Sequence, residues 1–187
     1  MRTYMIVFDS LPIEKSRIRV GRNPQSLVTA CRCVNIALFV SGNLRRDVQI
    51  VLSQCEDDGV SFITFPGDRL KRVSPDERSI SFFIMKAADH LERIASGEEA
   101  TMNNGIRVEK CTPDEMLDSL SKSQVYLADP SSEIMPRQIR LKPESIFLYP
   151  VDSPLGINPS DFSFDLLWKP EHPERFINDL NRAFDYS

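Results

Sequence analysis

Cysteine and histidine are both scarce in this sequence of 187 residues, which holds four cysteines and two histidines. These residues are Cys31, Cys33, Cys55, Cys111, His90 and His172. No two cysteines have the C-x-x-C spacing of a zinc ligand pair, and neither histidine has a further ligand at metal spacing. We therefore expect no metal site, and we expect reduced, partly buried thiols in a cytoplasmic protein.

Long apolar runs are also missing. The runs present are far too short to cross a bilayer, and residues 1–9 lack the apolar segment and cleavage site of a secretory signal. The P-loop, G-x-G-x-x-G and G-x-S-x-G motifs are absent as well. These absences exclude a membrane protein and argue against the enzyme classes that depend on those three motifs.

A large excess of one charge is missing too. The chain has 23 Lys and Arg against 27 Asp and Glu, so its formal net charge is -4. This balance argues against a wholly basic nucleic-acid binder but leaves room for a local basic face. With 41% hydrophobic and 27% charged residues, the chain has the composition of a globular protein, and its length fits a single domain over residues 1–187.

Short apolar runs alternate with amphipathic stretches along the chain. Strands are expected at residues 2–9, 48–53, 60–65, 106–108, 124–128, 145–149 and 164–168, and helices at residues 24–40, 75–94, 113–120 and from residue 173 onward. Residues 10–24 are expected to be irregular and basic. Strands that alternate with helices predict an α/β domain with a largely parallel sheet flanked by helices.

The segment from Leu44 to Arg78 carries the strongest chemical signal. Arg45, Arg46 and Asp47 directly precede an expected strand, where a sheet presents its loops to a ligand. Arginine offers a planar fork of donors that suits phosphate, and aspartate can accept a hydrogen bond from a base edge or orient an arginine. A solvated loop with a local ion pair is the alternative interpretation, because surface pairs are common and weak.

The end of this segment precedes the best-marked helix. Ser74 and Glu77 have the S-x-x-E spacing of a capping box, with Pro75 at the first helical position, so capping explains most of residues 74–77. Arg78 is not explained in this way, because a positive charge in the first turn opposes the helix dipole. A phosphate or a neighbouring carboxylate would satisfy it.

Three motifs, in this order and spacing, resemble those of a known family. They are Cys31-Arg32-Cys33-Val34, Leu44-Arg45-Arg46-Asp47-Val48 and Lys71-Arg72-Val73-Ser74-Pro75-Asp76-Glu77-Arg78. The chain is similar in them to the archaeal tRNA pseudouridine-54 N1-methyltransferases of the SPOUT class, specifically from Met1 to about Leu91 and more weakly through Tyr149. The resemblance implies a homodimer with a C-terminal trefoil knot. Its expected activity is transfer of a methyl group from S-adenosylmethionine to N1 of pseudouridine in the T-loop of tRNA.

The resemblance also implies the residues that face the substrate. They are Arg45, Arg46, Asp47, Arg72, Asp76 and Arg78. N1 of pseudouridine carries a proton that must leave, and Asp47 would accept or position that proton as the catalytic residue. The arginines would bind phosphates of the RNA.

The cofactor-binding residues implied by the resemblance lie in the second half of the chain. They are Leu127, Pro150, Gly156, Leu166, Leu167, Trp168 and Lys169. Here the chain departs from the family pattern, because residues 150–156 replace a Gly-Asp-His loop and the linker that follows is shorter. A knot pocket binds S-adenosylmethionine mostly through backbone groups, so changed side chains are compatible with binding, whereas a shortened knot loop would oppose it.

Three functions are therefore compatible with the sequence. The first is an active tRNA pseudouridine N1-methyltransferase that uses S-adenosylmethionine. The second is a non-catalytic RNA-binding relative that has lost the cofactor pocket. The third is a SPOUT-like enzyme that acts on another RNA or on a small molecule. The expected partners are tRNA and a second copy of the chain.

Overall fold

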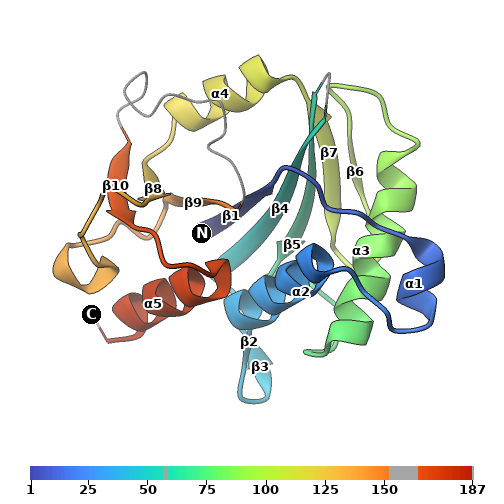
Figure 1. Cartoon of the computed structure of the whole chain (residues 1–187), viewed down its shortest axis with the longest axis horizontal. Coiled ribbons are helices and arrows are strands. Elements are labelled where there is room, and N and C mark those ends of the chain that lie inside the picture. Colours follow the sequence, from blue (N-terminus) through green and yellow to red (C-terminus); the bar gives the residue numbers. More distant parts are fainter. Residues whose placement is uncertain (57–58, 152–163, 187) are drawn as a thin grey trace.

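The computed structural model describes residues 1–56, 59–151 and 164–186, and in these residues an eight-stranded sheet is flanked by helices (Figure 1). The strands follow the order β10-β8-β9-β1-β4-β5-β7-β6 across the sheet. Their bounds are β1 Arg2–Phe8, β4 Val48–Glu56, β5 Gly59–Pro66, β6 Glu99–Thr101, β7 Arg107–Cys111, β8 Val125–Asp129, β9 Ile146–Pro150 and β10 Asp165–Trp168. The strands from β10 to β4 pair in parallel, and those from β4 to β6 pair antiparallel. The predicted α/β domain with a largely parallel sheet is confirmed.

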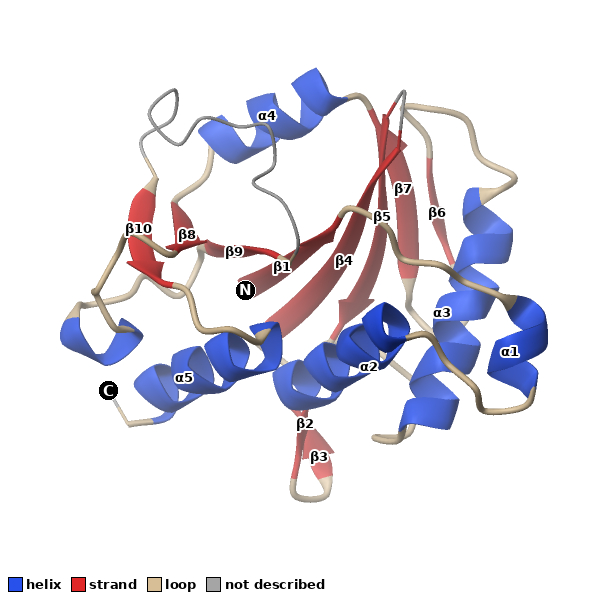
Figure 2. Cartoon of the chain, in the orientation of Figure 1, coloured by secondary structure: helices blue, strands red, loops and turns tan. Residues whose placement is uncertain are grey.

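Strand β1 lies inside the sheet, between β9 and β4 (Figure 2). Its side chains alternate between two cores, as the two-residue period of a strand requires. Tyr4, Ile6 and Phe8 are buried on the face that α2, α3 and α5 cover, and Met5 and Val7 are buried on the face that α4 covers. Because both faces of β1 are buried, its sequence is almost continuously apolar.

The helices are α1 Lys15–Arg19, α2 Gln25–Leu38, α3 Glu77–Leu91, α4 Pro113–Ser121 and α5 Pro173–Asp185, with a 3-10 helix η1 at Pro136–Gln138. A small two-stranded ribbon, β2 Phe39–Val40 and β3 Asn43–Leu44, follows α2. The start of α4 agrees with the sequence, because Thr112 and Glu115 form a complete capping box. Helix α5 packs beside α2 on one face of the sheet, so the last helix of the chain lies close to the first strand (Figure 1).

The predicted start of α3 was wrong. The helix begins at Glu77 rather than Pro75, and Asp76 is its N-cap, accepting a hydrogen bond at Oδ1 from the Ser79 amide at 2.8 Å. Ser74 instead donates its own backbone N–H to Ser79 Oγ at 2.9 Å. Aspartate caps a helix as well as serine does, so the S-x-x-E spacing identified the right region and the wrong capping residue.

Several short elements were not predicted, among them the ribbon strands β2 and β3 and the 3-10 helix η1. Helix α1 lies in the stretch that was expected to be irregular, and β6 is the edge strand that pairs with β7. Both are too short for a periodic pattern to appear in the sequence, since α1 has five residues and β6 has three.

The expected trefoil knot depends on residues 152–163, which lie outside the described residues, as does Gly156. Among the residues that are described, no helix is long and apolar enough to cross a membrane. The same part of the chain holds no group of three or more His, Cys, Asp and Glu side chains that could bind a metal ion.

Candidate functional site

The loop from Arg45 to Asp47 connects β3 to β4 and lies against the loop that follows β5. The Arg46 guanidinium donates from Nη1 to the carbonyl oxygens of Gly67 and Asp68, at 2.9 and 3.4 Å. Gly67 donates its backbone N–H to the Val48 carbonyl at 2.9 Å. These contacts hold the two loops predicted to face the substrate against each other.

Only glycine fits at position 67. A Cβ placed there would collide with the carbonyl oxygens of Arg45 and Val48, both of which belong to backbone that cannot rotate away. We expect Gly67→Ala to lower the free energy of unfolding by about 1–3 kcal/mol, the usual cost of forcing extra atoms into a packed site. Urea denaturation followed by circular dichroism measures this loss. Asp68→Ala, in the same loop, should change stability by less than about 0.5 kcal/mol, and equal effects of the two changes would contradict the collision.

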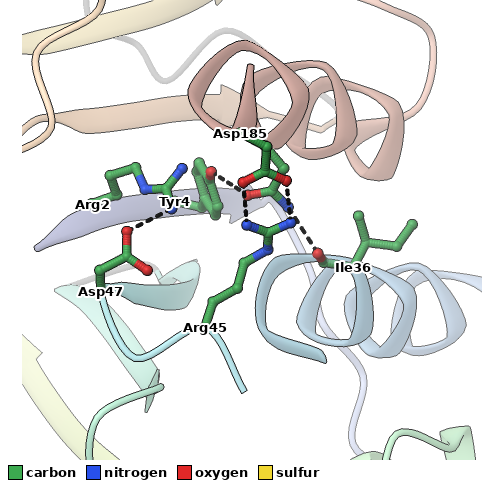
Figure 3. A network of polar contacts seen from close by, with 7 residues as sticks. Arg2, Tyr4, Ile36, Arg45, Asp47 and Asp185 are labelled. Atoms are coloured by element: carbon green, nitrogen blue, oxygen red, sulfur yellow. Dashed lines mark hydrogen bonds and ion pairs between the residues drawn. The ribbon is translucent and has the colours of Figure 1, made fainter. Parts of the chain in front are cut away.

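Arg45 is held by the last helix. Its guanidinium makes two hydrogen bonds to the Asp185 carboxylate, both at 2.6 Å (Figure 3). The Arg45 side chain is 17% exposed and that of Asp185 is 41% exposed. The paired hydrogen bonds raise the pKa of Arg45 and lower the pKa of Asp185. Arg45 thus has an intramolecular carboxylate partner, which the sequence interpretation did not foresee.

Asp47 is held by the first strand. Arg2 donates from Nη2 to Asp47 Oδ2 at 2.6 Å (Figure 3). The Arg2 guanidinium carbon lies 4.4 Å from the centroid of the Phe184 ring. The Arg2 side chain is 5% exposed, whereas the Asp47 side chain is 67% exposed. A buried cation therefore orients a carboxylate that remains open to solvent.

A third contact connects the same elements through the core. Tyr4 Oη donates to Asn181 Oδ1 at 2.7 Å, and Asn181 Nδ2 donates to the Ile36 carbonyl at 2.9 Å (Figure 3). Burial raises the pKa of Tyr4, so its hydroxyl stays protonated and remains a donor at neutral pH. Helix α5 is thereby bonded to β1, to α2 and to the loop of Arg45.

The other residues predicted to face the substrate lie between β5 and α3. Arg72 is exposed and has a φ of 61°, a left-handed conformation that is uncommon for residues other than glycine. Backbone strain of this kind is concentrated at functional positions. Arg78 is exposed in the first turn of α3, and no carboxylate among the described residues pairs with it. Asp76, by contrast, is engaged by its role as the helix cap.

Most of the predicted cofactor residues lie on three neighbouring parallel strands. Leu127 on β8, Pro150 on β9, and Leu166, Leu167 and Trp168 on β10 are brought together, with Lys169 directly after them. Leu127 is in register with Leu166 on one side and with Leu148 on the other, so three leucines form an apolar row on one face. Leu167 points to the opposite face and is fully buried there, which leaves only its backbone for a ligand.

The network around Arg45 includes residues that the sequence interpretation missed. Arg2, Phe184 and Asp185 lie near the two ends of the chain, far in sequence from residues 45–47. No local pattern pairs residues separated by 140 positions, as Arg45 and Asp185 are. Only the position of α5 beside β1 brings them together.

The architecture defines a SPOUT-like α/β protein. A solved structure with this fold is that of Nep1 from Archaeoglobus fulgidus, bound to S-adenosylhomocysteine. The two chains align over 98% of this one and 99% of that one, with a TM-score of 0.55 and 11% sequence identity. A likeness at that level of identity shows the fold alone.

The family is shown by the sequence. Residues 21–152 match the family described as "Putative SAM-dependent RNA methyltransferase". Because the match covers more than half of the chain, the protein belongs to this family.

Individual relatives match over shorter segments. Among them are three relatives that are each named tRNA (pseudouridine(54)-N(1))-methyltransferase. The protein from Methanococcus maripaludis strain C5 is 52% identical over 68 residues, 35% of this chain and 32% of the relative. That from Methanocaldococcus jannaschii is 39% identical over 74 residues, 39% and 36% of the two chains. The protein from Natronomonas pharaonis is 26% identical over 123 residues, which are 65% of this chain and 61% of the relative. The chain thus matches about a third of the length of the first two relatives.

Proposed function

We propose that this protein methylates N1 of pseudouridine in the T-loop of tRNA, using S-adenosylmethionine. The observation that carries the proposal is the loop of Arg45, Arg46 and Asp47, in which a solvent-open carboxylate is oriented by the buried Arg2 beside two arginines. The names of the relatives support the same reaction, and so does the family to which the chain belongs.

Asp47 is the proposed catalytic base. As the bond between carbon and N1 forms, the proton on N1 must leave, and a carboxylate open to the substrate side can accept it. One Asp47 oxygen is occupied by Arg2, so the other is left to face the substrate. Arg46 and Arg45 keep the loop in place through Gly67 and Asp185, which makes them positioning residues. Arg72 and Arg78 are exposed and suited to RNA phosphates.

The proposed cofactor site is the carboxyl end of β8, β9 and β10. Asp47 lies at the amino end of the parallel strands, so in this proposal it acts on a base held at the cofactor of a second chain in the homodimer proposed below. When bound at β8, β9 and β10, S-adenosylmethionine would supply the methyl group from its sulfonium centre. Leu166 is half-buried on the outermost of these strands and offers apolar surface to the adenosyl part of such a ligand, because small-molecule sites are mostly apolar with a few polar groups. Leu127 and Leu148 are buried beside it, so only their backbone is left for a ligand. Pro150 and Trp168 end their strands at the edge where α/β proteins bind ligands.

Isothermal titration with S-adenosylmethionine tests the cofactor half of the proposal. We expect saturable heat with one site per chain. No heat at millimolar cofactor, combined with retained binding of tRNA, would replace the proposal with a non-catalytic RNA-binding protein. Binding of the cofactor without methylation of pseudouridine-containing tRNA would instead favour another substrate.

We also propose that the protein is a cytoplasmic homodimer. A groove of about 700 Å³ between α5 and residues 135–143 supports this, because it is rimmed by exposed Ile139 and Tyr186 and includes Phe184. Aromatic, methionine and arginine side chains are enriched at interfaces between protein chains. The groove is also lined by Met135, Arg137 and Arg140. Sedimentation equilibrium would measure the assembly, and a monomer at micromolar concentration would contradict it.

A further inference from the structure

Helix α1, which the sequence did not predict, forms one wall of a surface pocket. The pocket has a volume of about 410 Å³ and lies between α1 and the first turns of α3. Its lining includes Arg19 from α1, and Asp76, Arg78 and Phe82 from the start of α3. Two of these residues, Arg19 and Phe82, have no part in the function proposed above.

The charge in this pocket is positive and uncompensated. Neither Arg19 nor Arg78 has a carboxylate partner among residues 1–56, 59–151 and 164–186. The one acid in the lining, Asp76, accepts the hydrogen bond that caps α3. Arg78 also opposes the dipole of α3 from its first turn, so a bound anion would offset an unfavourable interaction.

The exposed aromatic ring of Phe82 lies between Arg78 and a third cation, Lys86. The Phe82 side chain is 44% exposed, although large apolar side chains are usually buried. Phe82 lies one turn after Arg78, and Lys86 lies one turn further along the same helix, with its Nζ 5.7 Å from the centroid of the Phe82 ring. Lys86 and Lys15 also face Asp89, at 4.0 and 2.6 Å. The Phe83 ring meets Phe82 edge-on at 5.4 Å and supports it from the protein side.

We propose that this pocket binds one unstacked nucleotide of the RNA substrate. The Phe82 ring stacks on the base, and Arg19 and Arg78 bind the phosphates on either side of it. An aromatic ring flanked by arginines is the usual means of holding single-stranded RNA, because every base offers a stacking face and every linkage a negative charge. The inference rests on the proposed function in naming RNA as the partner, and it adds a contact remote from the methylated base.

The test is binding of the full-length protein to an in vitro transcribed tRNA, measured by fluorescence anisotropy at fixed salt. Phe82→Leu should weaken binding about fivefold to a hundredfold, the range that loss of one stacked base produces. Phe82→Trp should bind at least as tightly as the unchanged protein. Arg19→Ala should weaken binding. It should also reduce the slope of log affinity against log salt concentration by about one unit, the contribution of a single phosphate contact. Arg93→Ala, an exposed arginine beyond the end of α3, is the charge-matched control and should stay within about twofold.

Three results would overturn the inference. If Phe82→Leu binds tRNA as tightly as the unchanged protein and methylation is intact, the pocket does not bind RNA, and the proposed function is unaffected. A change in sedimentation of Phe82→Leu without a change in tRNA affinity would assign the pocket to a protein partner. Failure of the unchanged protein to bind tRNA would overturn both proposals. Titration with S-adenosylmethionine separates a local effect from unfolding, because Phe82→Leu should retain cofactor affinity.

Discussion

Replacing Asp47 with asparagine is expected to slow methyl transfer to tRNA by ~10²–10⁴-fold, the usual contribution of a positioned base. Asparagine keeps the shape of the side chain and an oxygen that can accept the hydrogen bond from Arg2, so the loop should stay in place. It cannot accept the proton from N1 at neutral pH. Single-turnover methylation with saturating enzyme measures the chemical step, and the affinities for tRNA and for S-adenosylmethionine should stay within about twofold.

The control for this change is Asp68→Asn. Asp68 is a carboxylate in the adjoining loop, and its side chain pairs with its neighbour Arg69 at 3.3 Å. Loss of this charge should alter the rate by less than about twofold. A rate for Asp47→Asn within threefold of the unchanged protein would assign proton removal to another group or to water. A loss of tRNA affinity that accounts for the whole decrease would make Asp47 a binding residue.

The second large effect is expected at Asp185. Changing it to alanine removes both acceptors from Arg45, whose side chain is 17% exposed and lies beside the buried Tyr4. A partly buried guanidinium left without a partner costs about 2–3 kcal/mol, somewhat less than for a fully buried charge because Asp185 is itself 41% exposed. Urea unfolding of Asp185→Ala, Arg45→Ala and the double variant gives the coupling between them.

An exposed ion pair on α4 is the control for these variants of Arg45 and Asp185. Lys122 and Asp118 on α4 lie 2.5 Å apart with side chains 71% and 63% exposed. Asp118→Ala should change stability by less than about 0.5 kcal/mol, because water screens such pairs. If Asp185→Ala costs no more than Asp118→Ala, the bond from Arg45 to Asp185 does not stabilise the position of α5.

The ion pair between Arg45 and Asp185 should also make the free energy of unfolding depend on pH. Arg45 lowers the pKa of the Asp185 carboxyl in the folded state. The stabilisation is therefore complete above the ordinary carboxyl pKa of about 4, and it is lost as the pH falls through the lowered folded-state value. The difference in unfolding free energy between the unchanged protein and Asp185→Asn should be constant near neutral pH and shrink below about pH 4.

Periodic elements were predictable from the sequence because their signals are local. Each signal comes from residues that are close together in the sequence. Examples are the apolar run of β1, the amphipathic pattern of α2 and the capping box formed by Thr112 and Glu115. The start of α3 was misassigned for the same reason, because the short segment before it contains two good capping residues and only the folded backbone selects Asp76.

The candidate site was predictable only in part. Arg45, Arg46 and Asp47 were identified by their chemistry and by a family resemblance, and their role in the reaction stays a prediction. Their partners were not identifiable, because Asp185 reaches Arg45 from the last helix and Arg2 reaches Asp47 from the first strand. The alternative interpretation, a solvated loop with a local ion pair, describes these residues only in part, because both ion-pair partners are remote in sequence. Arg45 and Asp47 each have an ion-pair partner, and Arg46 bonds backbone carbonyls.

The hydrogen bonds from α5 to the loop of residues 45–47 can form only late in synthesis of the chain. The loop and β4 leave the ribosome long before α5, so Arg45 and its neighbours meet Asp185 and Phe184 only at the end of synthesis. A nascent chain that stops after β9 would carry every residue of the loop without the helix that orients it. In such a stalled or truncated product Arg45 would lack its Asp185 partner and Arg2 would lack the Phe184 ring.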